Sequence, residues 1–218
     1  DGVWLDLPTT TEQVQAALRQ IGISSDNPQG LFISGYFAEE EKRFAIPYNM
    51  VLASNVDELN FLASRLETLS TGERAELNAA LQAPQSELFS IGRITDFPEN
   101  VDYYVHLPDV HGPAQLGDYY LNRSGMVDMP EEWKGGIDTA QFGRYVAQQE
   151  QGAFTQYGYL VKSGDEWQKV HEGQPVPEEY RVLSFPAPEV LRDSANIPPP
   201  VQPETEPQKV IPIILNGK

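Results

Sequence analysis

Carboxylates are the side chains that could do most chemistry in this sequence, and they are dense between Asp96 and Gly143. This segment holds nine aspartates and glutamates but only two cationic side chains, Arg123 and Lys134. The acids stand singly or in one pair among tyrosines and turn residues. Because enzyme sites usually concentrate their unusual groups in one cleft, this spacing indicates an anionic surface rather than a catalytic pocket.

A metal site is the chemical alternative in the same segment. His106, Asp109 and His111 fall within HLPDVHG, and imidazole and carboxylate groups can bind zinc or iron at such short spacing. The prolines and the glycine indicate a turn that holds polar residues, and the third histidine, His171, lies far along the chain. We therefore assign no metal ligand and no cofactor. A metal-dependent hydrolase that uses these three residues would require bound metal in the purified protein.

Two pairs of adjacent acids could divide acid and base roles in glycoside chemistry. Glu131-Glu132 and Glu178-Glu179 each follow a proline, which is typical of the first turn of a helix. Glycosidases need two carboxyls that face each other across a cleft, and adjacent acids do not meet that need. The sequence also lacks a glycine-rich phosphate loop, a GxSxG motif and an HExxH motif. We expect a protein that is not an enzyme.

The overall charge restricts the class of partner. The chain has a formal charge of −17, and its first 152 residues hold 23 acids and 9 bases, a net charge of −14. Such a surface repels nucleic acid and anionic membranes, whereas it attracts a basic partner. About fourteen charges equal the phosphates along roughly 24 Å of DNA duplex. A basic protein surface is therefore the expected partner, with no direct nucleic acid and no membrane.

Cysteine and leader sequences are missing from the chain as given. Without cysteine, disulfides, thiolate metal sites and cysteine nucleophiles are excluded. The apolar runs, such as 210–215, are too short to cross a bilayer. Because the sequence begins at Asp1 with no basic-then-apolar leader, we expect a fragment of a longer protein, and we expect it to act in the cytoplasm.

The elements that must position the carboxylates begin with a small α+β unit at residues 1–54. Alternating apolar residues predict a strand at 3–7, and a helical apolar stripe capped by Thr10 or Thr11 predicts a helix that ends near Gly22. Further strands are expected at 31–37 and 44–52.

A helical middle unit is expected at 55–95. Asn55 with Glu58, and Ser70 with Glu73, form two capping-box patterns, each followed by leucines at helical spacing. Pro84 ends the second helix.

An acidic unit is expected at 96–161. It should hold a short helix near 114–121 and a helix from 138 to 151, with Phe142, Tyr145 and Val146 facing inward.

The C-terminal part is predicted to be a small β extension at 162–185 and a proline-rich tail at 186–218. Residues 154–161 and 167–170 read as a hairpin, which 180–185 could join as a third strand. Eight prolines in the last 33 residues predict an extended tail without a core of its own. The apolar 209–215 segment is expected to pair with a sheet edge or with a neighbouring molecule.

Several segments, in their order, resemble the ArdA family of antirestriction proteins. They are GVWLDL at 2–7, NVDELNFLA at 55–63, YYVHLPDV at 103–110, LGDYY at 116–120, DTAQFGR at 138–144 and GAFT at 152–155. The resemblance spans about residues 1–161. Members of the family usually have a strand before the GVW segment, and nothing after residue 161 matches the pattern.

The resemblance implies a fold and a function. It implies an elongated α+β chain of small α/β units in series, in a homodimer, whose carboxylates imitate DNA phosphates. Such proteins occupy the DNA-binding groove of type I restriction-modification enzymes in the bacterial cell and protect incoming mobile elements. The anionic surface found from the residues is consistent with this implication.

We therefore expect a DNA mimic in which many carboxylates each contribute modestly. The alternative is an acidic protein-protein adaptor that acts through its C-terminal extension, in which case deletion of 186–218 should abolish activity, whereas a mimic should keep it. The carboxylates expected to meet the partner are Asp57, Glu58, Glu67, Glu73, Glu76, Glu87, Asp96, Glu99, Asp102, Asp109, Asp118, Asp128, Glu131, Glu132 and Asp138.

Overall fold

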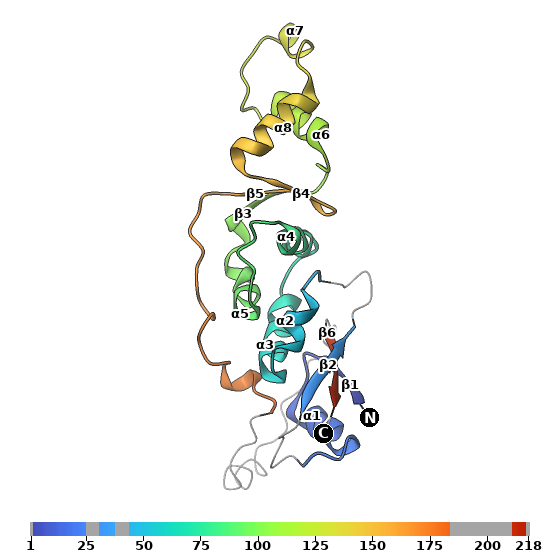
Figure 1. Cartoon of the computed structure of the whole chain (residues 1–218). Coiled ribbons are helices and arrows are strands. Elements are labelled where there is room, and N and C mark those ends of the chain that lie inside the picture. Colours follow the sequence, from blue (N-terminus) through green and yellow to red (C-terminus); the bar gives the residue numbers. More distant parts are fainter. Residues whose placement is uncertain (1, 25–30, 38–43, 184–210, 217–218) are drawn as a thin grey trace. The chain divides into compact units, whose positions relative to one another are not determined.

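The computed structural model describes residues 2–24, 31–37, 44–183 and 211–216, and it divides into two compact units (Figure 1). Unit 1 comprises residues 1–68, 90–95 and 171–218, and unit 2 comprises 69–89 and 96–170. Each unit combines helices with one three-stranded antiparallel sheet. The predicted α+β class is confirmed.

The sheet of unit 1 joins the two ends of the chain. Its strands are β1 (Gly2–Leu7), β2 (Phe32–Tyr36) and β6 (Ile211–Asn216), in the order β1-β6-β2. β6 runs antiparallel to both neighbours, and Ile214 stands opposite Trp4 on one side and Gly35 on the other. The apolar end of the chain was expected to pair with a sheet edge. It occupies the centre of the sheet instead (Figure 1).

Helices complete unit 1, and their starts follow the predicted caps. In α1 (Thr11–Gln20) the side chain of Thr10 accepts from the backbone N–H of Gln13, and in α3 (Val56–Glu67) the capping box of Asn55 and Glu58 forms as predicted. Shorter helices are α2 (Tyr48–Leu52), α5 (Ile91–Thr95) and the 3-10 helix η5 (Glu178–Tyr180). The core gathers apolar side chains of both strands and helices, including Leu5, Leu7, Val14, Leu18, Ile33, Leu59, Leu62, Leu66, Ile213 and Leu215.

The buried side chain of Asn60 links distant segments of this core through hydrogen bonds. Asn60, only 3% exposed, accepts a hydrogen bond from the backbone N–H of Thr9 at 2.6 Å and donates one to the carbonyl of Tyr180 at 3.0 Å. One amide side chain on α3 therefore holds the end of β1 and the distant 180 segment.

Two regions that were predicted to form strands are helical or irregular in the structure. The predicted strand at 44–52 is wrong, because Pro47 caps α2 and Tyr48 turns back to donate to the carbonyl of Ser34. Strands at 167–170 and in the described part of 180–185 are also wrong. At 167–170 the side chains of Asn100 and Asp96 accept hydrogen bonds from the backbone N–H groups of Gln168 and Val170. These N–H groups are then not available to pair with a neighbouring strand.

Unit 2 contains a three-stranded sheet with the strand order β3-β5-β4. β3 spans Tyr104–Leu107, β4 spans Ala153–Thr155 and β5 spans Gly158–Lys162. The hairpin predicted between 154–161 and 167–170 is wrong, because β4 and β5 pair through a turn at residues 156–157, inside the segment predicted as one strand. The helices are α4 (Thr71–Gln82), with the predicted Ser70–Glu73 capping box, and α6 (Pro113–Asp118), α7 (Glu131–Lys134) and α8 (Thr139–Glu150). The 3-10 turns η2 (Phe97–Glu99) and η3 (Val101–Tyr103) precede β3, and one π turn, η4 (Tyr119–Arg123), follows α6.

Candidate partner-binding surface

The acidic surface of unit 2 is supported by a close crossing of α6 and α8. A Cβ on Gly117 would lie 1.9 Å from the carbonyl oxygen of Thr139, and one on Gly143 would lie 1.8 Å from that of Pro113. Only glycine fits at either position, so the two backbones touch. This contact fixes the helix that carries Asp138 against the helix that ends at Asp118.

A small core beneath this crossing holds the helices on the sheet. Val110, Leu116 and Tyr159 are buried together, and Tyr120 packs beside them. Glu150 accepts hydrogen bonds from the hydroxyls of Tyr120 and Tyr159. Burial and the nearby carboxylate raise the pKa of both phenols far above the ordinary value, so both stay neutral donors and α8 is anchored at its C-terminal end.

The inward face predicted for α8 is partly wrong. Phe142 and Val146 are half-buried, but Tyr145 is 60% exposed. The close approach at Gly143 sets which side of α8 meets α6, and Ala147, one turn on, packs against the core. Tyr145 consequently lies on the solvent side.

The structure places the predicted carboxylates in three environments. Most belong to unit 2, and Asp57, Glu58 and Glu67 belong to unit 1. The fully exposed ones are Glu99, Asp102, Asp109, Asp128, Glu131, Glu132 and Asp138. The half-buried ones are Asp57, Glu58, Glu67, Glu73, Glu76, Glu87 and Asp118, and Asp96 is buried.

Several of these acids stabilise the backbone. Asp57 accepts from the N–H groups of Val182 and Leu183 at 2.7 and 2.8 Å. Glu58 and Glu73 accept from the N-cap residues of α3 and α4, and the bonds to Ser70 hold the pKa of Glu73 below its usual value. Part of the hydrogen-bonding capacity of these carboxylates is therefore used within the chain.

Asp96 and Glu76 contribute least to the surface. Asp96 is 0% exposed and accepts from the N–H of Val170. Burial, followed by the charges of Glu73 and Asp102, raises the pKa of Glu76 to about 8, so this carboxyl is largely protonated at neutral pH. The sequence places Glu73 and Glu76 one helical turn apart, whereas the nearness of Asp102 to them is a finding of the structure.

Three acids of the set have cationic partners. Asp118 meets Arg123 at 2.6 Å, Glu131 meets Lys134 at 2.7 Å and Glu87 meets Lys162 at 2.6 Å. Exposed pairs of this kind are weak, and the outward oxygens of Glu131, whose side chain is 81% exposed, stay open to solvent.

Exposed acids outside the predicted set also add negative charge. They are Asp6, Glu12, Asp165, Glu166, Glu178 and Glu179. A signal for four of them was present in the sequence, since Asp165 and Glu166 sit at a predicted turn and Glu178 and Glu179 at a predicted first helical turn. The prediction of partner contacts stopped at Asp138 and so omitted them.

His106, Asp109 and His111 do not converge as a metal site in the part of the chain that the structure describes, where no group of three potential ligands occurs. The ring nitrogen Nε2 of His106 lies 2.7 Å from the carbonyl oxygen of Tyr157. The imidazole of His106 is therefore occupied in joining β3 to the β4–β5 turn.

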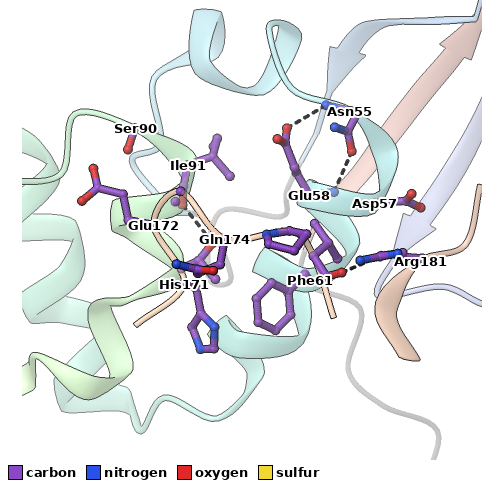
Figure 2. A pocket seen from close by; sticks show the side chains of 15 residues that line it. Asn55, Asp57, Glu58, Phe61, Ser90, Ile91, His171, Glu172, Gln174 and Arg181 are labelled. Atoms are coloured by element: carbon purple, nitrogen blue, oxygen red, sulfur yellow. Dashed lines mark hydrogen bonds between the residues drawn. The ribbon is translucent and has the colours of Figure 1, made fainter. Parts of the chain in front are cut away.

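Unit 1 contains a hollow of about 690 Å³ between α3, α5 and the 171–181 segment (Figure 2). Its lining includes Phe61, whose ring meets that of His171 edge-on at 4.9 Å. The carboxylates at this hollow are engaged within the unit: Asp57 and Glu58 with backbone N–H groups, and Glu172 with Arg93 at 3.1 Å. We assign no catalytic role to it.

Within the described residues, no helix is long and apolar enough to cross a membrane. The family model of the antirestriction protein ArdA matches residues 1–161, which include most of unit 2 and its exposed carboxylates. No curated protein matches the chain.

Proposed function

Because this chain belongs to the ArdA family of antirestriction proteins, we propose that it inhibits a type I restriction-modification enzyme by imitating DNA. The observation that carries the proposal is the set of exposed carboxylates on unit 2. A basic DNA-binding groove would take this surface in place of the duplex, with release of the same counterions.

The charge of unit 2 supports this proposal. Residues 69–89 and 96–170 hold 15 acids and 6 bases, a net charge of −9. The negative charge is distributed over several elements and does not gather in one cleft, as a mimic of a regularly charged polymer requires.

We propose a principal contact set of eight carboxylates, which we call the mimic set. They lie on unit 2 and are exposed residues, except for Asp118, which is included because its side chain is 44% exposed: Glu99, Asp102, Asp109, Asp118, Asp128, Glu131, Glu132 and Asp138. Asp57, Glu58, Glu67, Glu73 and Glu87 would contribute less because they are half-buried. Glu76 and Asp96 would contribute least, since one is largely protonated and the other is buried.

The remaining parts of the proposal follow from the family. The protein would act without catalysis and without a cofactor, as a homodimer, in the cytoplasm of a bacterial host where restriction enzymes meet incoming DNA. The segments 1–54, 55–95, 96–161, 162–185 and 186–218 remain our proposal for the domains of the chain.

Competition with DNA tests the proposal directly. The purified protein is titrated into a type I restriction-modification enzyme bound to labelled duplex, at low and at high salt. Displacement should occur and should weaken steeply as salt rises, because it depends on counterion release. No displacement at any salt, by protein shown to be folded, would rule out this inhibitor function for that enzyme.

A pair of charge-matched variants sharpens the test. The first changes four members of the mimic set to amides, D102N/D109N/D128N/E132Q. The second removes four exposed charges elsewhere, D6N/E166Q/E178Q/E179Q. At about 0.5 kcal/mol for each exposed charge, the first should weaken displacement by about thirtyfold, and the second by less than about threefold. A single amide change that abolished inhibition in a folded protein would contradict a distributed surface.

The adaptor remains the second candidate, and one observation changes how it is tested. Deletion of 186–218 would remove β6 from the centre of the unit 1 sheet, so loss of activity after deletion would not separate the two functions. Replacing 186–207 by a Gly/Ser segment of equal length retains β6. A mimic should inhibit normally after this replacement, whereas an adaptor that binds through the tail should not.

A further inference from the structure

The sheet of unit 1 is built around a strand that arrives from far along the chain. β1 pairs with β6 over six residues, from Gly2 to Leu7, and β2 pairs with β6 from Phe32 to Tyr36. In the strand order observed for the described residues, β1 and β2 are separated by β6. Without residues 211–216, both strands would present open backbone groups toward an empty slot.

The slot would recognise a strand through its apolar side chains as well as through its backbone hydrogen bonds. Ile213 and Leu215 are 0% exposed and stand opposite Leu5 and Val3 in β1, while Ile214 between them is half-buried. Leu5 and Ile33 supply buried side chains from the two flanking strands. The matching ligand is therefore an extended segment with apolar side chains at alternate positions, antiparallel to both neighbours.

The chain that delivers this segment is long. Residues 184–210 make a connection of 27 residues between Leu183 and Ile211. At roughly 3.3 Å per residue such a connection can span about 90 Å, which is several times the radius of gyration of roughly 14 Å expected for a unit of this size. The connection is long enough to reach the same slot in a neighbouring molecule.

We propose that the slot between β1 and β2 is a strand-binding site, and that it accepts residues 211–216 from a second copy of the chain as well as from its own. The contacts of β6 would be the same in both arrangements, because every residue that β6 pairs with lies in β1 or β2. Only the path of the connection differs between them.

Concentration then decides which arrangement prevails. A connection of 27 residues holds its own strand near the slot at an effective concentration on the order of millimolar. Below that concentration the strand closes on its own chain. Near and above it, reciprocal exchange links two copies through a complete sheet in each, which is a strand-swapped dimer. This inference does not depend on the proposed antirestriction function.

The absence of cysteine from the sequence gives a direct test. Trp4 and Ile214 are register partners on the same face of the sheet, and Trp4 is 54% exposed. One full-length variant carries W4C and another carries I214C. The two are mixed, unfolded in urea, refolded together at concentrations from about 0.01 to about 1 mM, chosen to bracket the effective concentration, and then oxidised. Mass spectrometry of the cross-linked peptides identifies the 4–214 bond.

Two controls make the result decisive. The double variant W4C/I214C should form the bond within one chain at low concentration, which verifies the register. A mixture of D6C with I214C places the cysteines two residues out of register, roughly 7 Å along the strand, where disulfide geometry is unfavourable. It should give at most a tenth of the cross-linked dimer.

The expected result is a 4–214 cross-linked dimer whose fraction rises with protein concentration and reaches about one quarter on the order of 1 mM, where about half of the chains are exchanged and half of the exchanged pairs contain both variants. The proposal is overturned if the double variant closes within the chain but the mixture yields no dimer at any concentration, since the slot would then accept only its own strand. It is also overturned if the double variant does not close, or if D6C cross-links as well as W4C does.

Discussion

Gly143 of α8 lies against Gly117 of α6 so closely that a Cβ on Gly143 would be 2.8 Å from the backbone nitrogen of Gly117. The same Cβ would be 1.8 Å from the carbonyl oxygen of Pro113. Gly143→Ala should therefore force the helices apart and destabilise unit 2 by about 3 kcal/mol or more. Urea denaturation followed by hydrogen exchange at α6 and α8 would measure the loss.

A matched control for this substitution is Gly72→Ala. Gly72 is also in a helix, α4, but a Cβ there meets nothing within 4 Å. Alanine should be neutral or stabilising by up to about 1 kcal/mol at such a position. Equal destabilisation by both variants would show that the close crossing is not the cause.

Glu76 should make stability fall as pH rises. Its pKa in the folded chain is about 8, raised from 4.5, so the folded state holds a proton that the unfolded state has lost. The stabilisation is complete below about pH 4.5 and is lost progressively as pH approaches 8. Glu76→Gln should remove this dependence and stabilise the protein at pH 9, by on the order of 1 kcal/mol after allowance for solvent screening.

Urea midpoints at pH 5, 7 and 9 for wild type and Glu76→Gln would check this expectation. Glu58→Gln is the control, because Glu58 accepts a hydrogen bond from the N-cap residue of α3 in unit 1, and glutamine preserves a capping box. A midpoint difference between wild type and Glu76→Gln that stays constant from pH 5 to pH 9 would contradict the raised pKa.

The ion pair of Arg93 and Glu172 should matter for the stability of unit 1. Nε of Arg93 lies 3.1 Å from both carboxylate oxygens, and the two side chains are only 10% and 22% exposed. Glu172→Gln removes the charge of this carboxylate from beside a buried guanidinium and should cost about 2 to 3 kcal/mol. Thermal unfolding would measure the loss, and Glu131→Gln, in an exposed pair, should cost less than about 1 kcal/mol.

Truncation after residue 207 should unfold unit 1 selectively. The truncated chain lacks β6, whose Ile213 and Leu215 are fully buried, and β1 and β2 lose their shared partner. Hydrogen exchange should show loss of protection in β1, β2 and α1 but retention in α6 and α8. Replacement of 186–207 by a Gly/Ser segment should leave protection unchanged in both regions.

Local signals predicted the helices of this fold well. The capping pairs Asn55–Glu58 and Ser70–Glu73 placed α3 and α4 within a residue or two, because an N-cap is set by neighbours three residues apart. Asp138 likewise caps α8 as expected. The strand at 44–52 failed because apolar alternation does not separate a buried irregular segment from a strand, and Pro47 begins a helix there.

Long-range relationships could not be predicted in the same way. Nothing local in 209–215 indicates that it belongs between two strands more than 170 residues earlier. The burial of Asp96 and the shared environment of Glu76 and Asp102 also depend on contacts between distant segments. The sequence identified acidic side chains correctly but could not decide which of them reach the surface.

The strand order of unit 1 has a consequence for synthesis on the ribosome. Tyr36, the end of β2, is made 175 residues before Ile211, which is roughly 10 to 35 seconds at bacterial and eukaryotic elongation rates. All of unit 2 leaves the ribosome within that interval. The N-terminal sheet is therefore completed only after all of unit 2 has been made, and until then β1 and β2 are exposed edges that a chaperone or another nascent chain can bind.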